Sequence, residues 1–329
     1  MLTTEPQSNT TASSLALTSP REPGVYFNLD EKSYHNDPSL GSSDEHKLAN
    51  NPSSYWFESW MNPNRPADKS TPAQERGKAV HALVLYGEAE FDRRYVRGAD
   101  HDDGMSPAEK AALTKAANAK AAKLGLVALP AQTYDNIAIA SAMMAKNPRL
   151  ANALVGGLNE VSVFWRDPAN GLPKKARIDC LKPRGVGDLK SLANKYGKPF
   201  PRACLDTVRW DRRDIQAKHY LDARAMIPKL AADGCVHGDH DAALLKAVVA
   251  SKEWAWQWVW WQAEGAPITF SKVLSPANPL LEVSAATIAK ADASYAEYME
   301  RFGPHEMWLL QEEPTELYLE ELGPFFGMS

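Results

Sequence analysis

The sequence predicts an α/β fold with a central mixed β-sheet flanked by helices. Three observations lead to this prediction: helical periodicity before residue 150, strand-like alternation between Glu160 and Ser191, and a second pair of strands after a further helix. A hairpin turn joins some of these strands, whereas a helix must cross over between others, so the sheet has mixed direction. The composition, 44% hydrophobic and 24% charged over 329 residues, is that of an ordinary globular protein.

The first third of the chain is predicted to be a tail followed by helices. Residues 1–23 are rich in Ser, Thr and Pro and are expected to be disordered, and residues 24–329 are expected to form a single domain. The helix over residues 73–86 places Gly77 and His81 four positions apart on one face, with the glycine at a packing contact. Other helices are predicted from Ser43 or Asp44 to Leu48, from near Tyr55, and over 107–125 and 130–147.

Strands begin after residue 157, where the hydrophobic pattern changes from a helical to a strand period. They are predicted over Glu160–Arg166, Lys174–Leu181, Val186–Ser191, Glu253–Gln262 and Ile268–Leu274. The turn signal Asp167–Gly171 (DPANG) joins the first two strands as a hairpin. Helices over 211–231 and 284–302 complete the pattern.

Three segments have both a structural and a functional interpretation. Trp254, Trp256, Trp258 and Trp260 alternate along one strand and could form a base-stacking platform, but a bare row of tryptophans would be a solubility hazard. We therefore expect a central strand packed under helices on both faces. The Ala- and Lys-rich segment 107–125 is expected to be a solvated amphipathic helix rather than a DNA-binding helix. The segment from His237 to His240 is expected to be a loop rather than a metal site.

The bulk properties favour a cytoplasmic protein that is not embedded in a membrane. No run of 18 or more apolar residues is present, and the first residues lack the pattern of a signal peptide. Cys180, Cys204 and Cys235 form no CxxC pair, so we expect buried or free thiols in a reducing compartment, and no four-cysteine zinc or iron–sulfur site.

Positive charge is concentrated in the middle of an acidic chain. The net charge is −4, yet residues 174–224 contain fourteen Lys or Arg against six Asp, a local balance of +8. Such a distribution favours a local phosphate-binding surface, although a solvated charged face would give the same count. Within it, Lys195 and Lys198, and the run from Arg209 to Asp214 with Arg212 and Arg213, are candidates for gripping a phosphate backbone; for that run, a solvated face is equally favoured.

Acidic side chains are expected to converge where three of the predicted strands meet. Asp179 lies near the end of one strand, and Asp188 and Lys190 follow on the next, two residues apart and therefore on the same face. Glu160 begins the strand before the hairpin, and a hairpin brings neighbouring strands within about 5 Å. Clustered carboxylates repel each other unless a cation lies between them, and their oxygens suit Mg²⁺ or Mn²⁺. Lys190 would hold an attacking water or stabilise the oxyanion, so the set suits phosphodiester hydrolysis.

An Asp–x–Lys triplet alone is a weak signal, and its ordinary interpretation is a surface ion pair. Three additions raise its weight: Asp179 on the preceding strand, Gly77–x–x–x–His81 on an upstream helix, and Gln216–x–x–x–Tyr220 on a downstream helix. This ordered series resembles the RecB-type nucleases of the PD-(D/E)xK superfamily. The resemblance implies a metal-site histidine at His81, metal-binding acids at Asp179 and Asp188, and a catalytic lysine at Lys190. It also implies that Gln216 and Tyr220 contact DNA and support the site.

The resemblance narrows to the C-terminal nuclease domain of exonuclease VIII (RecE) and its phage and prophage relatives. It rests on Gly24–Leu29 (GVYFNL), Ser33–His35, Pro52–Trp56 and Glu160–Trp165, and it covers about residues 24–326. It implies a RecE/λ-exonuclease-like core in the PD-(D/E)xK class. The gap from Asp179 to Asp188 is shorter than in that family, and the tryptophan-rich strand is not one of its hallmarks.

The same resemblance implies a Mg²⁺-dependent exonuclease that acts on the ends of linear double-stranded DNA. It implies 5′→3′ polarity, single strands produced for recombination, a homo-oligomer and a single-strand annealing protein as partner. Two Mg²⁺ ions would be held by Glu160, Asp179, Asp188, the carbonyl of Leu189 and His81, and Mn²⁺ could substitute. Two alternatives stay open: an endonuclease on the same fold, including a Cas-associated type, and a non-catalytic DNA-binding or inhibitory phage protein that retains the scaffold.

Overall fold

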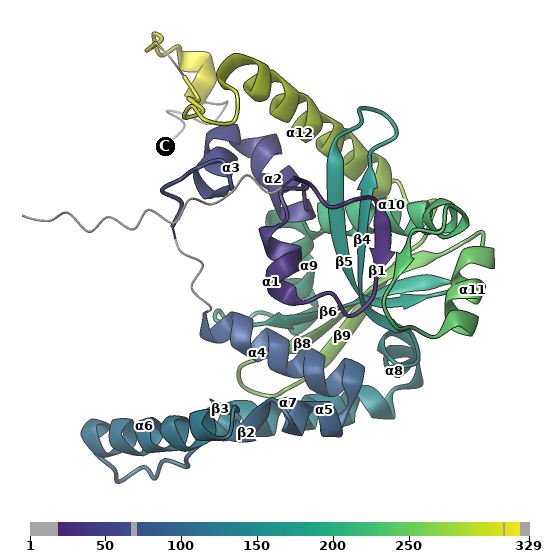
Figure 1. Cartoon of the computed structure of the whole chain (residues 1–329). Helices are drawn as coiled ribbons and strands as arrows, with labels where there is room; N and C mark the ends of the chain where they lie inside the picture. Colours follow the sequence, from purple (N-terminus) through teal and green to yellow (C-terminus); the bar gives the residue numbers. More distant parts are fainter. Residues whose placement is uncertain (1–18, 67–70, 312, 323–329) are drawn as a thin grey trace, which may run out of the picture.

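The computed structural model describes residues 19–66, 71–311 and 313–322, and it contains a seven-stranded mixed β-sheet (Figure 1). The sheet order is β7-β1-β4-β5-β6-β8-β9, with β6 and β8 parallel and β4–β5, β5–β6 and β8–β9 antiparallel. The strands are β1 (Gly24–Tyr26), β4 (Leu158–Arg166), β5 (Pro173–Lys182), β6 (Gly185–Leu192), β7 (Val236–His237), β8 (Ala255–Gln262) and β9 (Thr269–Leu274). A separate parallel pair is formed by β2 (Tyr95–Arg97) and β3 (Val127–Leu129). The predicted α/β fold with a central mixed sheet is confirmed.

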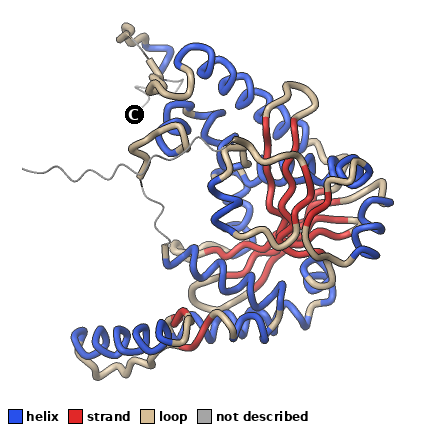
Figure 2. The backbone as a smooth tube through the Cα atoms, in the orientation of Figure 1, coloured by secondary structure: helices blue, strands red, loops and turns tan. Residues whose placement is uncertain are grey.

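Helices surround the strands, as Figure 2 shows in blue around red. The N-terminal helices are α1 (Glu31–Asn36), α2 (Ser42–Asn50), α3 (Pro52–Glu58), α4 (Pro72–His81), the π-helical turn η1 (Ala82–Tyr86) and α5 (Glu88–Asp92). The middle of the chain contributes α6 (Pro107–Lys123), α7 (Ala131–Lys146), α8 (Pro148–Leu154), α9 (Phe200–Trp210) and α10 (Arg213–Ala232). The C-terminal part adds α11 (Ala242–Ala250), α12 (Leu280–Phe302) and the 3-10 turn η2 (Leu319–Leu322).

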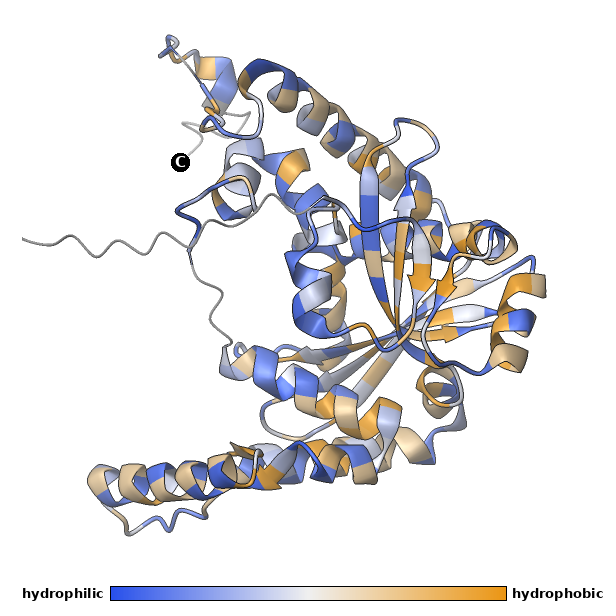
Figure 3. Ribbon diagram, in the orientation of Figure 1, coloured by the Kyte–Doolittle hydropathy of each residue, from blue (hydrophilic) through white to orange (hydrophobic). Residues whose placement is uncertain are grey.

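The two faces of the sheet bury separate hydrophobic clusters. On one face, Val161 and Ile178 pack with residues of α9, α10 and α11, among them Leu221. On the other face, Leu189 and Val259 pack with residues of α4, α7 and α8. Figure 3 shows hydrophobic residues along the strands between these layers. With both faces covered, the interior strands carry apolar residues on both sides, which is typical of the centre of an α/β protein.

The tryptophan-rich strand β8 is buried on both faces, as predicted. Trp256, Trp258 and Trp260 are at most 3% exposed and lie in the cluster on the α10 side. Trp261 is fully buried with the α4 side of the sheet. A base-stacking role for this strand is therefore excluded by burial. Truncating any one of these rings would cost about 3–5 kcal/mol, because the cavity could not be refilled.

Helix α6 differs from its prediction. The predicted solvated helix is present, but Ala121 is its buried residue and the others are exposed or half-exposed on all sides, so its predicted amphipathic character is wrong. Figure 1 shows α6 at the edge of the molecule. Its Ala and Lys residues have high intrinsic helix propensity. The Ser106 hydroxyl and the Glu109 carboxylate form a reciprocal capping box at its start. The helix can therefore form with little tertiary packing.

Other boundaries moved by a few residues, and some short elements were not predicted. The helix predicted over 73–86 is α4 followed by the π-helical turn η1. The sequence did not reveal α9 as a separate helix, nor the short strand β7 that contains His237. Of the tail predicted over 1–23, residues 1–18 lie outside the described residues, whereas the Arg21 N–H donates to Asp37 at 2.8 Å.

Candidate active site

The candidate site lies where strands β5 and β6 separate. Their pairing runs from Lys182↔Gly185 to Cys180↔Gly187, and Asp179 and Asp188 come next on the two strands. There the Leu189 N–H donates to Asp179 Oδ2 at 2.9 Å, so a carboxylate replaces the neighbouring backbone as acceptor. On its other edge, β6 pairs with β8 along its whole length. Asp179 and Asp188 therefore lie close together, as predicted, at the point where β5 and β6 separate.

Asp188 and Lys190 point to the same side of β6, as their spacing predicts. Lys190 Nζ lies 2.6 Å from Asp188 Oδ1, and Gln216 Nε2 of α10 donates to the same oxygen at 3.3 Å. Asp188 is 1% exposed, and its other oxygen, Oδ2, is buried with no hydrogen-bond partner among the described residues. Burial raises the pKa of the Asp188 carboxyl; Lys190 opposes that rise and the Asp179 charge adds to it. A buried carboxylate oxygen without a donor is costly, and a cation bound to it would remove that cost.

His81 approaches the same point from the other side of the sheet. It is the last residue of α4, and its Nε2 lies 3.0 Å from the Leu189 carbonyl and 3.6 Å from Asp179 Oδ2. The helix is fixed at its start by the Thr71–Gln74 capping box. It then continues as the π-helical turn η1, a feature often found at functional sites. Gly77 faces Ser191, where an added methyl group would sit at an ordinary 3.9 Å, so the packing does not require glycine.

Glu160 occupies a distorted point on β4 beside Asp179. The β4–β5 pairing passes from Asn159↔Cys180 to Val161↔Ile178, and Glu160 between them has φ +47°. A non-glycine residue in this region is uncommon, and such strain of about 1–3 kcal/mol tends to occur at functional sites. Glu160 Oε2 accepts a hydrogen bond from Arg177 Nη2 at 3.1 Å. Burial and the nearby Glu160 raise the pKa of Tyr86. Arg177 was not among the predicted site residues, although its position two residues before Asp179 on one strand places it on the same side.

Helix α10 lines the candidate site with side chains that are not exposed on the surface. Tyr220 packs edge-on against Trp256, with ring centroids 5.8 Å apart. Burial, together with the charges of Asp179 and Asp188, raises the pKa of the Tyr220 hydroxyl. Gln216 Oε1 is buried and, among the described residues, has no hydrogen-bond partner. Both residues of the predicted pair therefore lie beside the acids.

The predicted phosphate contacts have different surroundings. Lys195 is exposed in the turn after β6. Arg213 is 40% exposed, with Asp211 at 3.8 Å. Arg212 is held internally by two hydrogen bonds of 2.9 Å to Asp214 and one to Thr287. Lys195 and Arg213 are thus better placed than Arg212 to meet a phosphate.

The oxygen atoms at the point where β5 and β6 separate are of the kind that a hard divalent cation binds. Among the described residues, no group of three or more His, Cys, Asp and Glu side chains is arranged so that it could hold a metal ion. Magnesium, however, is commonly held by one or two carboxylates, with waters and substrate phosphates completing its shell. Asp179, the Leu189 carbonyl and the unpartnered Asp188 Oδ2 supply such oxygens. Glu160 is bound to Arg177, so its role as a ligand stays a prediction.

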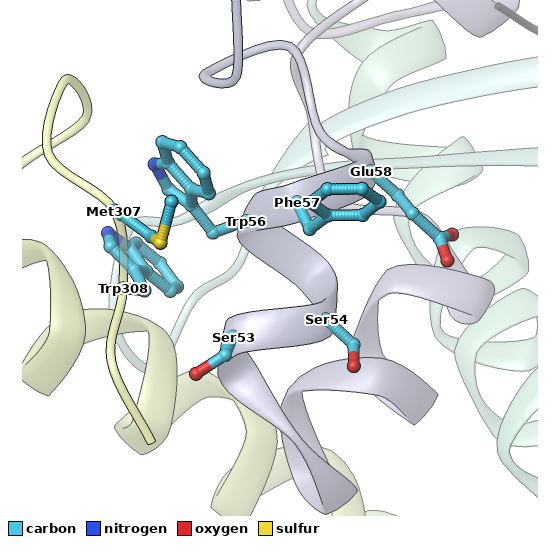
Figure 4. A pocket seen from close by; sticks show the side chains of 7 residues that line it. All are labelled: Ser53, Ser54, Trp56, Phe57, Glu58, Met307 and Trp308. Atoms are coloured by element: carbon cyan, nitrogen blue, oxygen red, sulfur yellow. The ribbon is translucent and has the colours of Figure 1, made fainter. Parts of the chain in front are cut away.

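A pocket elsewhere in the molecule carries no comparable chemistry. It has a volume of about 270 Å³ and lies between α3 and the segment after α12, lined by Trp56, Phe57, Met307 and Trp308 among others (Figure 4). Its carboxylate, Glu58, is paired with Lys47 at 2.7 Å. The pocket is a gap at the edge of an aromatic cluster, remote in the fold from β6.

The fold and the site define an α/β protein with a mixed β-sheet. At the point where β5 and β6 separate, a buried aspartate, Asp188, is paired with a lysine, Lys190. No protein-family model matches the chain, and no curated protein matches it. Among solved structures, the chain is similar to a protein from Eubacterium rectale described as a "putative exonuclease", with 13% identity and a TM-score of 0.48. The match covers 88% of this chain and 97% of that one. A likeness this distant carries no argument about the reaction, so function rests on the site.

No helix among the described residues has the length and apolar character needed to cross a membrane. Cys180 and Cys204 are buried free thiols, and Cys235 is half-buried. His237 and His240 stack on Tyr26 and Phe27, with centroid distances of 4.5 and 4.4 Å.

Proposed function

We propose that this protein is a Mg²⁺-dependent deoxyribonuclease, an exonuclease that hydrolyses phosphodiester bonds of linear double-stranded DNA. The observation that carries the proposal is the Asp188–Lys190 pair beside Asp179 and His81, in which the Lys190 and His81 side chains are 18% and 22% exposed and can therefore meet a substrate. The ion pairs of Lys174 elsewhere in the fold also leave carboxylate oxygens without a hydrogen-bond partner among the described residues, but the Lys174 side chain is only 3% exposed. Asp179 on the neighbouring strand and His81 on α4 add further atoms that can bind the metal ion that phosphodiester hydrolysis needs.

Asp179, Asp188 and the Leu189 carbonyl would hold the cation, with His81 and Glu160 nearby. When bound, Mg²⁺ or Mn²⁺ would activate a water and screen the charge on the phosphate. Lys190 Nζ lies 2.6 Å from Asp188 Oδ1 and can hold the attacking water or the phosphate oxygen on which charge develops. Gln216 fixes the orientation of the Asp188 carboxylate by donating to Oδ1. Lys195 and Arg213 would contact the phosphates of the incoming strand.

The finer parts of the proposal come from the resemblance to the exonuclease VIII family. They are 5′→3′ polarity, two metal ions, a homo-oligomer, a single-strand annealing protein as partner, the production of single strands for recombination and a cytoplasmic location. An endonuclease on the same scaffold would share the chemistry and differ in substrate geometry. A non-catalytic DNA-binding protein on the same scaffold would bind DNA without hydrolysing it in any metal.

The test compares linear and covalently closed circular duplex DNA in Mg²⁺, with EDTA as the metal-free control. We expect the linear form to be degraded and the circle to persist; cutting of the circle would instead establish the endonuclease. Lys190→Ala should lower the rate by about 10²- to 10³-fold, since it removes a charge that stabilises the transition state. Lys246→Ala, an exposed lysine of α11, serves as the matched control. Equal rates for the two variants would reject the assigned site.

A further inference from the structure

The turn that follows β6 presents an exposed aromatic side chain. Tyr196 is 88% exposed in the turn between Asn194 and Lys198. The Asn194 side chain clamps this turn: its Oδ1 accepts from the Lys198 N–H at 3.2 Å, and its Nδ2 donates to the Lys198 carbonyl at 2.6 Å. Gly197, at φ +59°, supplies the left-handed conformation. A large ring is therefore held out to solvent by a locally fixed backbone.

A second exposed aromatic side chain ends the next helix. Trp210 is the last residue of α9 and is 66% exposed, although tryptophan is usually largely buried. The Arg209 guanidinium lies over its ring, 4.4 Å from the centroid. The helix buries Phe200 and Cys204 against the core, so Trp210 is not needed to anchor it. Exposed aromatic rings with adjacent cations are typical of surfaces that bind unpaired nucleotides.

Both rings lie on the chain that links the two halves of the candidate site. Strand β6 carries Lys190, helix α10 carries Gln216, and residues 193–213 connect them through α9 (Figure 1). Tyr196 comes six residues after Lys190, and Trp210 comes six residues before Gln216. A ligand bound to this connecting segment would therefore lie next to the site in the chain.

The connecting segment is also basic. Residues 193–213 contain six Lys or Arg and two Asp. Two of the cations, Lys198 and Arg202, are tied to Asp206 at 2.7 and 3.0 Å. Lys195 and Arg209, next to the two rings, are exposed. Each exposed ring thus has an exposed cation beside it in the sequence, which suits a base and its phosphate.

We infer that residues 193–213 bind single-stranded DNA, with unpaired bases stacked on Tyr196 and Trp210 and phosphates facing Lys195 and Arg209. This inference rests on the proposed function and names the form of DNA held at its site. Bases in a duplex stack on one another, whereas each unpaired base offers a ring face to an aromatic side chain, whatever its sequence. The choice of this ligand over a protein partner rests on the place of the segment between the strand of Lys190 and the helix of Gln216, because protein interfaces are also enriched in Tyr, Trp and Arg.

The test measures binding of a labelled oligothymidylate and of a blunt duplex of equal length, by fluorescence anisotropy in EDTA. Tyr196→Ala and Trp210→Ala should each weaken binding of the single strand by about tenfold, and binding of the duplex by less than about twofold. Tyr196→Phe and Trp210→Phe keep a stacking face and should retain affinity. Phe57→Ala on α3, which removes a ring that is 51% exposed, is the matched control.

Two results would overturn the inference. Equal weakening for single strand and duplex would mean that the segment contacts only the backbone. Unchanged DNA binding, with or without a change in self-association, would mean that the rings serve another contact. The readout is separate from hydrolysis: if Lys190→Ala digests DNA at the parent rate, the proposed function fails, while the anisotropy result still decides the stacking surface.

Discussion

Two clusters in this protein combine the same types of side chain and differ in what can reach them. The site cluster is formed by His81, Asp179, Asp188, Lys190 and Gln216. The Lys174 cluster is formed by Glu45, Asp167, Lys174, His219 and Asp292. Each places a lysine and a histidine among buried carboxylates.

In the Lys174 cluster, three carboxylates surround one ammonium. Lys174 Nζ lies 3.0 Å from Glu45, 3.0 Å from Asp167 and 2.8 Å from Asp292. Burial works against the charge, but Glu45 and Asp292 outweigh it and raise the pKa of Lys174. The contacts join α2, the β4–β5 hairpin and α12 to β5. The cluster therefore attaches the outer helices to the sheet.

His219 completes the Lys174 cluster as a cation. Its Nδ1 lies 2.8 Å from Glu45 Oε2, and its Nε2 lies 2.8 Å from the Lys175 carbonyl. The contact with Glu45 is an ion pair rather than a well-directed hydrogen bond. Both neighbours are acceptors, so both ring nitrogens must carry protons. Burial alone would lower the pKa of His219, but Glu45 reverses the effect and the pKa is raised.

Access to solvent separates the two clusters. The Lys174 and Glu45 side chains are 3% and 0% exposed, whereas the Lys190 and His81 side chains are 18% and 22% exposed. A substrate can reach Lys190, and none can reach Lys174 without opening the fold. The same residue types thus stabilise the protein in one place and are available for chemistry in the other.

The largest effect that would test this contrast is expected from Lys174→Met. Removing the ammonium leaves three carboxylates without their shared cation, and breaking a buried ion pair in this way costs about 3–5 kcal/mol. The free energy of unfolding, measured by urea titration, should fall by that amount, whereas Lys246→Met on the surface of α11 should change it by less than about 0.5 kcal/mol. A loss below about 1 kcal/mol for Lys174→Met would show that the carboxylates do not depend on its charge.

The sequence predicted one cluster and missed the other because of how their residues are distributed. Asp188 and Lys190 are two apart on one strand, and Gln216 and Tyr220 lie one helical turn apart, so local periodicity places them. The Lys174 cluster brings together residues 45, 167, 174, 219 and 292, and only the folded chain makes them neighbours. Strand positions could be predicted from residue patterns, whereas this convergence could not.

The split between β5 and β6 was likewise beyond the sequence. Its markers are Glu160 at φ +47° and the Asp179 side chain bound to the Leu189 N–H. The first is an irregularity in the β4–β5 pairing and the second lies where β5 and β6 separate, and neither leaves a pattern of hydrophobic residues. The helix predicted over 211–231 corresponds to α10, whereas no element was predicted over α9.

An intermediate effect is expected from His219→Asn, which removes the buried cation facing Glu45. At pH 6 the free energy of unfolding should fall by about 1–3 kcal/mol, the cost of leaving a buried polar group without its partner. Because the pKa of folded His219 is raised, its contribution is fully present below the unfolded value of about 6.5 and is lost as pH rises through the folded pKa. The gap between parent and variant should therefore narrow from pH 6 to pH 9. A gap that stays constant over this range would contradict a protonated ring.

The smallest effect, and of opposite sign, is expected from Asp188→Asn in EDTA. The folded environment disfavours the Asp188 charge, since burial raises the pKa of the carboxyl despite Lys190. An amide of the same shape removes that penalty, and we expect a gain of about 0.5–2 kcal/mol at pH 7, with loss of hydrolysis. Because the pKa of folded Asp188 is raised, its charge destabilises the parent protein only above the unfolded pKa of about 3.9. The stability that Asp188→Asn gains over the parent should therefore shrink as pH falls toward that value.

Glu45→Gln is the matched change in the Lys174 cluster and should destabilise the protein, because there the charge is paired at 3.0 Å and 2.8 Å. If both amides destabilise equally, Asp188 is a structural carboxylate like Glu45, and the contrast between the clusters disappears.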